Sequence, residues 1–306
     1  MAAENHCENN NLSELYENLI VIDCGANLTN KKFFKDLDQV IHRAQDSGVR
    51  KILVHGSNIK NCKEALRLTR IYPGIIYSSA GIHPMDSKNV IDEPSCWHEF
   101  EEISKQSEVV AIGPCGLDYH KDVSECEIQK EIFKRQIKLA CDIQKPLLIH
   151  ERSAQNDVME ILSSFPESEL PPRIVRSFMG TTDEALIYLR AGFYLSLTGF
   201  LCKDKSENSV RKLLEDNLIP LDHLLVESDA PFMYPNTRAS KLSTEVKSCL
   251  TERSLMFLHR YCTFQRNEPC CLPALVELIA AFMQKKPEDI ALSTAFNALK
   301  LFGLSQ

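Results

Sequence analysis

The sequence predicts an α/β fold, a TIM (β/α)8 barrel, and two observations support this prediction. Eight short apolar runs alternate with helical patterns, and eight is the number of parallel strands that closes such a barrel. Several runs also end in a polar residue that could bind a metal or a phosphate, as at His83, His150 and Asp229. Such runs are typical of buried parallel strands, whose C-terminal ends carry the chemistry of a barrel.

The predicted strands and helices are separated by turn residues such as Gly48, Gly74, Pro146, Gly192 and Pro220. The strands cover, in order, Leu19–Cys24, Lys51–Val54, Ile75–Ala80, Val109–Ile112, Leu147–Ile149, Arg173–Phe178, Phe193–Leu197 and Leu224–Glu227. The helices that follow the first seven strands cover Phe33–Ser47, Asn61–Ile71, Trp97–Gln106, Glu125–Ile143, Ala154–Phe165, Asp183–Ala191 and Ser209–Asn217.

The C-terminal part begins with an irregular stretch, Phe232–Asn267, whose length suggests an excursion over the active face. It contains a helical pattern near Ser248–Tyr261, and two closing helices follow, Leu272–Met283 and Pro287–Phe302. We therefore expect one barrel domain over residues 19–306, preceded by a flexible extension over residues 1–18. The alternative is a doubly wound open sheet, which should have a glycine-rich loop after its first strand, where this chain has Gly25 alone.

Composition narrows the possible functions. A formal charge of −7 over 306 residues argues against a passive nucleic-acid-binding module, but not against an enzyme that meets phosphate in a local pocket. The sequence has no apolar stretch near the ~20 residues of a membrane span, and its start does not resemble a signal peptide. Its 12 cysteines include no CxxC pair, which is typical of reduced thiols. We expect a cytoplasmic or nuclear protein that does not interact with membranes.

Two carboxylates and two histidines are the main candidates for chemistry. Glu227 and Asp229 are two positions apart on a strand, so their side chains should point to the same face. Buried carboxylates are costly unless they meet a cation or transfer protons, although an ordinary ion pair with Arg or Lys would also explain them. His83 and His150 are expected at the same face, and imidazole plus carboxylate is a common ligand set of hydrolytic metal sites. Asp118, after the Gly116 turn, is expected to fix a loop.

The chain resembles the TatD family of metal-dependent deoxyribonucleases, in the amidohydrolase superfamily, from about Val21 to Phe302. The order and spacing of the matching stretches make the resemblance specific. They are Asp23–Thr29, Ala80–Pro84, Val109–Gly113 with Cys115–Asp118, Ile149–Arg152, Ser177–Thr181, Glu227–Pro231 and Arg266–Pro269. The last stretch resembles a family element near the pocket rim, but it could equally fix the entry to the closing helices.

The resemblance implies a barrel that hydrolyses the phosphodiester bonds of DNA with a divalent ion, Mg²⁺ first and Mn²⁺ or Zn²⁺ as alternatives. It places two metal ligands on His150 and Asp229, and Asp229 would also orient or deprotonate the attacking water. His83 matches a further polar position of the family pocket.

The chain departs from the family at two ligand positions. Pro114 stands where the family has a glutamate, and proline has no side-chain donor atom. Arg176 stands where the family has a histidine, and a guanidinium keeps its proton and cannot bind a metal at neutral pH. Divalent ions should therefore bind weakly, if they bind at all.

Two accounts of the site remain open. In the first, metal and most nuclease activity are lost, and Arg176 lies near Asp229 in place of the ion. In the second, one ion is held by His150 and Asp229 with help from Glu227, His83 or Glu151, while Arg176 clamps a phosphate of the DNA substrate. We expect impaired or altered catalysis. The alternatives are a weak homologue that binds nucleic acid or a partner through the same pocket, and a hydrolase of another small ester or amide.

Overall fold

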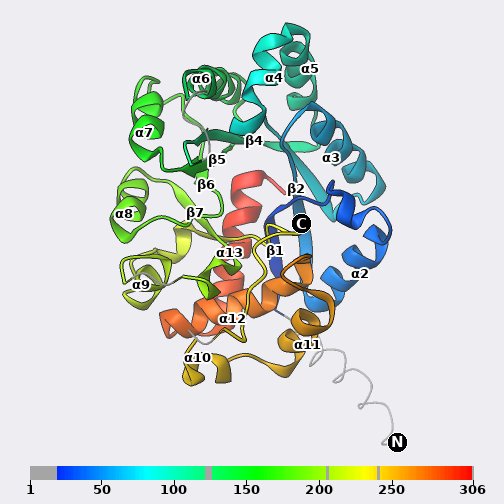
Figure 1. Ribbon diagram of the computed structural model, residues 1–306, viewed down its shortest axis with the longest axis vertical. Helices are drawn as coiled ribbons and strands as arrows, with labels where there is room; N and C mark the ends of the chain where they lie inside the picture. Colours follow the sequence, from blue (N-terminus) through cyan, green and yellow to red (C-terminus); the bar gives the residue numbers. More distant parts are fainter. Residues whose placement is uncertain (1–18, 121–125, 205–206, 240–241, 305–306) are drawn as a thin grey trace, which may run out of the picture.

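The computed structural model describes residues 19–120, 126–204, 207–239 and 242–304, and its core is an eight-stranded parallel sheet in the order β1 to β8. In Figure 1 these strands lie inside a ring of helices. The strands are β1 Val21–Ala26, β2 Val49–Gly56, β3 Ile76–Ala80, β4 Val109–Asp118, β5 Leu147–Arg152, β6 Arg173–Val175, β7 Tyr194–Leu197 and β8 Leu224–Val226. The fold is therefore the predicted TIM barrel. The predicted extension, residues 1–18, lies outside the described residues.

The helices alternate with the strands as a barrel requires. They are α2 Leu37–Ser47, α3 Ile59–Ile71, α4 Ser87–Asp92, α5 Pro94–Ser104, α6 Cys126–Ile143, α7 Gln155–Ser163, α8 Thr182–Arg190, α9 Val210–Glu215, α10 Thr244–Ser248, α11 Glu252–Tyr261, α12 Leu272–Met283 and α13 Pro287–Phe302. Short 3-10 helices are η1 Lys31–Phe33, η2 Pro84–Asp86, η4 Gly199–Cys202, η5 Leu221–His223 and η6 Pro269–Cys271. No helix in the described ranges is long and apolar enough to cross a membrane.

The boundaries of most elements differ from the predictions, most clearly in three places. The helix predicted from Phe33 begins at Leu37, and η1 precedes it. A helix that we did not predict, α4, follows β3. Strand β4 continues to Asp118, six residues beyond its predicted end, because it stays paired with β5 as far as Asp118 opposite Arg152.

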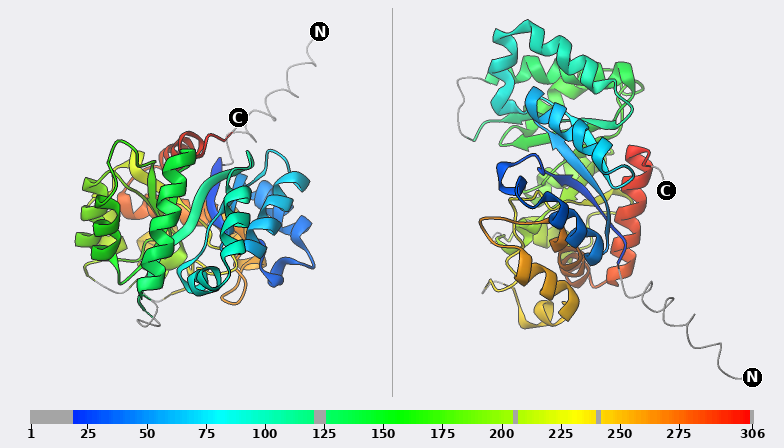
Figure 2. Two further views of the ribbon diagram at one scale, coloured as in Figure 1. Left: turned by 90° about the horizontal axis from the view of Figure 1, so that it is seen from above. Right: turned by 90° about the vertical axis from the view of Figure 1, so that its right-hand side faces the viewer.

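One end of the barrel is closed by α13. Its buried residues Ala295, Ala298 and Phe302 pack with strand residues such as Ile22 and Leu225. Asn297 Nδ2 donates hydrogen bonds to the carbonyls of Leu221 and Leu224, at 2.8 and 2.9 Å. Because Leu224 begins β8, these bonds place α13 at the N-terminal ends of the strands, on one side of the barrel in Figure 2. The C-terminal ends of the strands, at the opposite end of the barrel, are not covered by α13, and the candidate site lies there.

The ends of β1 and β8 are held together at that opposite end. Asp229 N donates to Gly25 O and Asn27 N donates to Ala230 O, both at 2.8 Å. The fully buried Asp23 accepts from Ser228 N at 2.9 Å, from Ser228 Oγ at 2.6 Å and from Gly25 N at 3.1 Å. Burial raises the pKa of Asp23 to about 7, and these hydrogen bonds oppose the shift. The turn after β8 is therefore fixed to the first strand.

This closure gives the first prediction. Asp23→Ala should lower the free energy of unfolding by about 3 kcal/mol, because it leaves two buried backbone N–H groups without an acceptor. Asp23→Asn keeps an acceptor oxygen for both groups and should cost about 1 kcal/mol. Urea denaturation measures both values. Equal losses in the two variants would contradict the role given to these hydrogen bonds.

Candidate active site

The side chains proposed from the sequence lie at the C-terminal end of the barrel. His83 follows β3, His150 lies near the end of β5, and Arg176 directly follows β6. Glu227 and Asp229 follow β8. Because all eight strands are parallel, these positions lie at the same end of the sheet.

The central contact is made by three residues that we call the arginine cluster, namely Arg176, Glu227 and Asp229. Arg176 Nη2 lies 2.6 Å from Asp229 Oδ1 and 3.0 Å from Glu227 Oε1. Arg176 and Asp229 are each 9% exposed and Glu227 is fully buried. One guanidinium nitrogen thus binds both carboxylates. They point to the same side as expected, but not because they share a strand: both residues lie beyond the end of β8, and Asp229 has a φ of 47°.

Burial and charge determine protonation in this cluster. Burial favours the neutral form of Glu227 and raises its pKa. The positive charge of Arg176 acts to lower this pKa, and the negative charges of Asp229 and Asp23 act to raise it further. Burial also acts to lower the pKa of Arg176, but the two carboxylates outweigh it and the pKa is raised. Arg176 therefore stays a fixed positive charge.

His83 and His150 lie beside each other, with ring centroids 4.4 Å apart. His83 Nδ1 accepts a hydrogen bond from Met85 N at 3.2 Å, and His150 Nε2 lies 3.2 Å from Asp118 Oδ2. Burial lowers the pKa of His150, although Asp118 partly opposes this. Burial acts to raise the pKa of Asp118, but its contacts with His150 and with the N–H of His120 lower it to about 2. At neutral pH His150 is therefore a neutral ring that donates Nε2–H to the Asp118 carboxylate.

His55, at the end of β2, belongs to this region and was missed from the sequence. It is 4% exposed, its Nδ1 lies 3.3 Å from Ser79 Oγ, and its Nε2 is buried without a hydrogen-bond partner. A β-carbon on Gly25 would lie only 2.3 Å from His55 Nε2 and 2.7 Å from Glu227 Oε2. A larger residue at position 25 would therefore meet His55 and Glu227. The signal was present, because Ile52–Val54 is an apolar run that ends in histidine, as at His150.

Two other candidate positions do not face an ion. Glu151 accepts from Ala154 N at 2.7 Å and from Tyr188 Oη at 3.2 Å, so both of its oxygens are used in local structure. Pro114 is buried in β4, between the positions that pair with Leu147 and Ile149, and offers no side-chain donor.

The residues present do not fit a divalent ion. Within the described residues, no group of three or more His, Cys, Asp or Glu side chains converges on a point where an ion could be held. The two nearest carboxylates already share a guanidinium, whose positive charge would repel a metal ion. Divalent ion binding by His150 and Asp229 remains a prediction from the family resemblance, and we derive no chemical step from it.

A pocket of about 560 Å³, which we call the barrel pocket, lies among the loops that follow β5, β6 and β7. Its lining includes Arg152, Phe178, Phe200 and Lys203, but not Arg176 or Asp229. Arg152 and Lys203 have no ion-pair partner within the described ranges. The pocket therefore offers cationic groups and apolar surface beside the arginine cluster.

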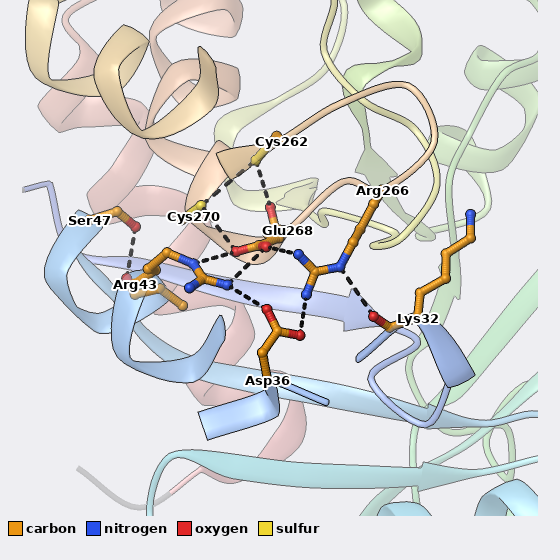
Figure 3. A network of polar contacts seen from close by, with 9 residues as sticks. Lys32, Asp36, Arg43, Ser47, Cys262, Arg266, Glu268 and Cys270 are labelled. Atoms are coloured by element: carbon orange, nitrogen blue, oxygen red, sulfur yellow. Dashed lines mark hydrogen bonds and ion pairs between the residues drawn. The ribbon is translucent and has the colours of Figure 1, made fainter. Parts of the chain in front are cut away.

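The turn that carries the cluster is supported from behind by the stretch Arg266–Pro269. The fully buried Asn267 donates from Nδ2 to Ser228 O at 3.0 Å, and its backbone N–H donates to Pro231 O at 3.0 Å. Figure 3 shows the adjoining network, in which the Glu268 carboxylate binds Arg43 Nε at 2.8 Å and Arg266 Nη1 at 2.5 Å. These contacts favour a supporting role for the stretch.

Comparisons with known proteins agree on one family. The family model described as "TatD related DNase" matches residues 22–303. A protein of Erwinia billingiae described as "3'-5' ssDNA/RNA exonuclease TatD" is 33% identical over 284 residues, which cover 93% of this chain and 99% of that protein. A protein of Escherichia coli K12 with the same description is 33% identical over 285 residues, covering 93% and 100%.

Two solved structures share the fold. A TatD-family hydrolase of Entamoeba histolytica superposes with a TM-score of 0.81 at 20% identity, covering 94% of this chain and 99% of that one. A TatD homologue of Escherichia coli gives 0.75 at 22% identity, covering 93% and 98%. At these identities they support the barrel fold alone.

The ion pairs give a second prediction. Arg176→Met should lower the free energy of unfolding by about 3–5 kcal/mol at pH 7, because it leaves two buried carboxylates without a cation. The loss should be smaller at about pH 5, where Glu227, whose pKa is raised, takes up a proton. Arg176→Lys keeps a charge and serves as the control in the same denaturation series. A loss for Arg176→Met of about 1 kcal/mol or less would mean that the pairs are not needed for stability.

His55 gives a third prediction. Burial, with Arg176 and His83 nearby, lowers the pKa of His55 well below 6.5, so only the unfolded state gains its proton as the pH falls. Its contribution to stability is complete above about pH 6.5 and is lost as the pH falls below that value. As the pH falls from about 6.5 to 5, the free energy of unfolding should therefore decrease less in His55→Gln than in wild type. Parallel curves for wild type and variant would contradict the assignment.

Proposed function

Because the chain belongs to the TatD family, we propose that this end of its barrel binds a nucleic acid strand. We further propose that Arg176 has taken the place of the divalent ion, so that metal-dependent hydrolysis of phosphodiester bonds is weak or lost. The observation that carries this proposal is the single Arg176 nitrogen shared by Asp229 and Glu227.

The arginine cluster explains why hydrolysis should suffer. A guanidinium supplies positive charge but keeps its protons, so it cannot generate a hydroxide from bound water as a metal ion does. Asp229 Oδ1, which would accept a proton from the attacking water, is already held by Arg176 at 2.6 Å. The cluster therefore keeps the electrostatic balance of the site without its nucleophile.

Strand binding is supported by the barrel pocket and by the relatives. Arg152 and Lys203 offer positive charge for phosphate oxygens, and Phe200 offers apolar surface for a base or sugar. The lining also holds three acidic residues, and each of them accepts hydrogen bonds from neighbouring groups. Glu151 accepts from Tyr188 and Ala154, Glu184 caps α8, and Asp204 accepts from Ser209 Oγ and Arg211 N. The relatives named above are described as exonucleases of single-stranded DNA and RNA, and DNA is the ligand that we expect here.

A second candidate function is a working metal-dependent nuclease. It is favoured by the retention of His150 and Asp229, and by His83 in contact with His150. It requires Arg176 to leave both carboxylates and bind a phosphate of the substrate instead.

One experiment separates the two candidates. A labelled single-stranded DNA should bind wild-type protein equally well in EDTA and in Mg²⁺ or Mn²⁺, and should be cleaved at the rate of the no-protein control. Pro114→Glu with Arg176→His should raise metal-dependent cleavage by at least about tenfold, because together they supply a carboxylate and an imidazole. Each single change should do less, since the ligands of one ion act as a unit.

The controls decide the interpretation. Arg176→Lys with Pro114→Glu keeps a positive charge at the cluster and should gain no metal-dependent activity. If wild type cleaves in Mg²⁺ at a rate typical of a metallonuclease and Arg176→Ala abolishes cleavage, Arg176 is a phosphate clamp and the metal-replacement proposal is wrong.

A further inference from the structure

A second concave surface lies at the same end of the barrel but outside it. This groove, of about 850 Å³, runs between the segment after β1 and the start of α3. Leu28, Leu37 and Ile59 line it as apolar residues, and Phe34 stands at its edge with 68% of its surface exposed. An exposed aromatic ring beside an apolar floor is a surface on which a flat, partly apolar ligand group can stack.

The charge at this groove is positive, although the chain as a whole carries −7. Lys60 lines the groove. Lys31 and Lys35 are not among its lining residues, but they lie three residues before and one residue after Phe34 in the chain. In the described part of the protein none of these three lysines has an ion-pair partner. The acidic residue of the lining, Glu64, is bound by Arg67 through both oxygens, at 2.7 and 2.9 Å. The surface therefore offers uncompensated cations.

The groove is connected to the arginine cluster by two residues. Phe232 lies in the turn directly after the cluster, where its N–H donates to Asp229 O at 2.8 Å, and its side chain is 48% exposed. Lys32 Nζ lies 5.8 Å from the centre of the Phe232 ring, and Lys32 is two residues before Phe34. The backbone oxygen of Lys32 accepts from Arg266 Nε at 3.2 Å, which fixes this turn against the supporting network of Figure 3. Aromatic and cationic side chains thus lead from the cluster to the groove.

We propose that the groove binds the part of a single-stranded nucleic acid that extends away from the cluster, with a base stacked on Phe34 and phosphates beside Lys60 and Lys31. This inference rests on the proposed function, because the end of the same strand occupies the barrel pocket. Alternating aromatic rings and cations match a strand whose bases and phosphates alternate, and every base has a face that can stack. A duplex does not expose its base faces for such contacts, so the groove should favour single strands.

Fluorescence anisotropy in EDTA tests the proposal, with a labelled thymidine trinucleotide that fills the pocket alone and a dodecamer that also reaches the groove. Phe34→Ala should weaken dodecamer binding by about tenfold, as the loss of one stacked base predicts. Lys60→Ala should lower the slope of log affinity against log salt by about 0.7, the value for one phosphate contact with a single strand. Neither change should alter trinucleotide affinity by more than about twofold. Arg152→Ala, in the barrel pocket, should weaken the binding of both the trinucleotide and the dodecamer.

Matched controls come from the closed end of the barrel. Phe296 on α13 is 64% exposed, and Lys286 precedes α13 at the surface. Phe296→Ala and Lys286→Ala should leave dodecamer binding unchanged. Unchanged dodecamer affinity in Phe34→Ala and Lys60→Ala would contradict strand binding in the groove, but not the proposed function of the barrel pocket. The groove would then suit another ligand such as an acidic peptide. Failure of wild type to bind the trinucleotide would instead contradict the proposed function of the barrel pocket.

Discussion

The ion pairs from Arg176 to Glu227 and Asp229 are the interaction on which the site depends. Two carboxylates this deeply buried need a cation, since an uncompensated buried charge costs several kcal/mol (about 3–5 when one partner of a buried pair is removed). In a metal-dependent hydrolase that cation is a divalent ion, whereas here it is a side chain encoded in the sequence. The side chain meets the charge requirement, and under the proposed function the chemistry that a metal would supply is weak or lost.

Neighbouring segments at this end of the barrel hold these residues in place. Asp23 on β1 binds Ser228, Asn267 supports the same turn from the C-terminal segment, and Gly25 leaves room for Glu227 and His55. This support is what a precise binding site needs, because a side chain keeps its geometry only when its neighbours fix it. The scaffold of the family is therefore retained around a changed centre.

The architecture could be predicted from the sequence more accurately than the side-chain contacts could. Helices Leu272–Met283 and Pro287–Phe302 were predicted to the residue. The structure shows that each has proline in its first turn and ends at a left-handed residue, Gln284 or Gly303. Strand β4 was predicted too short, because its apolar run ends at Ile112 and only tertiary pairing with β5 extends it to Asp118. Glu227 and Asp229 point to the same side as expected, but the turn after β8, with Asp229 at positive φ, sets this direction instead of strand alternation. That one nitrogen of Arg176 binds both depends on side-chain conformations that no residue pattern specifies.

The central claim is that a guanidinium occupies the place of the metal ion. Diffraction from crystals grown in excess Mn²⁺, recorded at a wavelength where manganese scatters anomalously, tests it directly. The account predicts guanidinium density between Glu227 and Asp229 and no anomalous peak at that end of the barrel. An anomalous peak in contact with His150 and Asp229, with Arg176 turned away from both carboxylates, would contradict it.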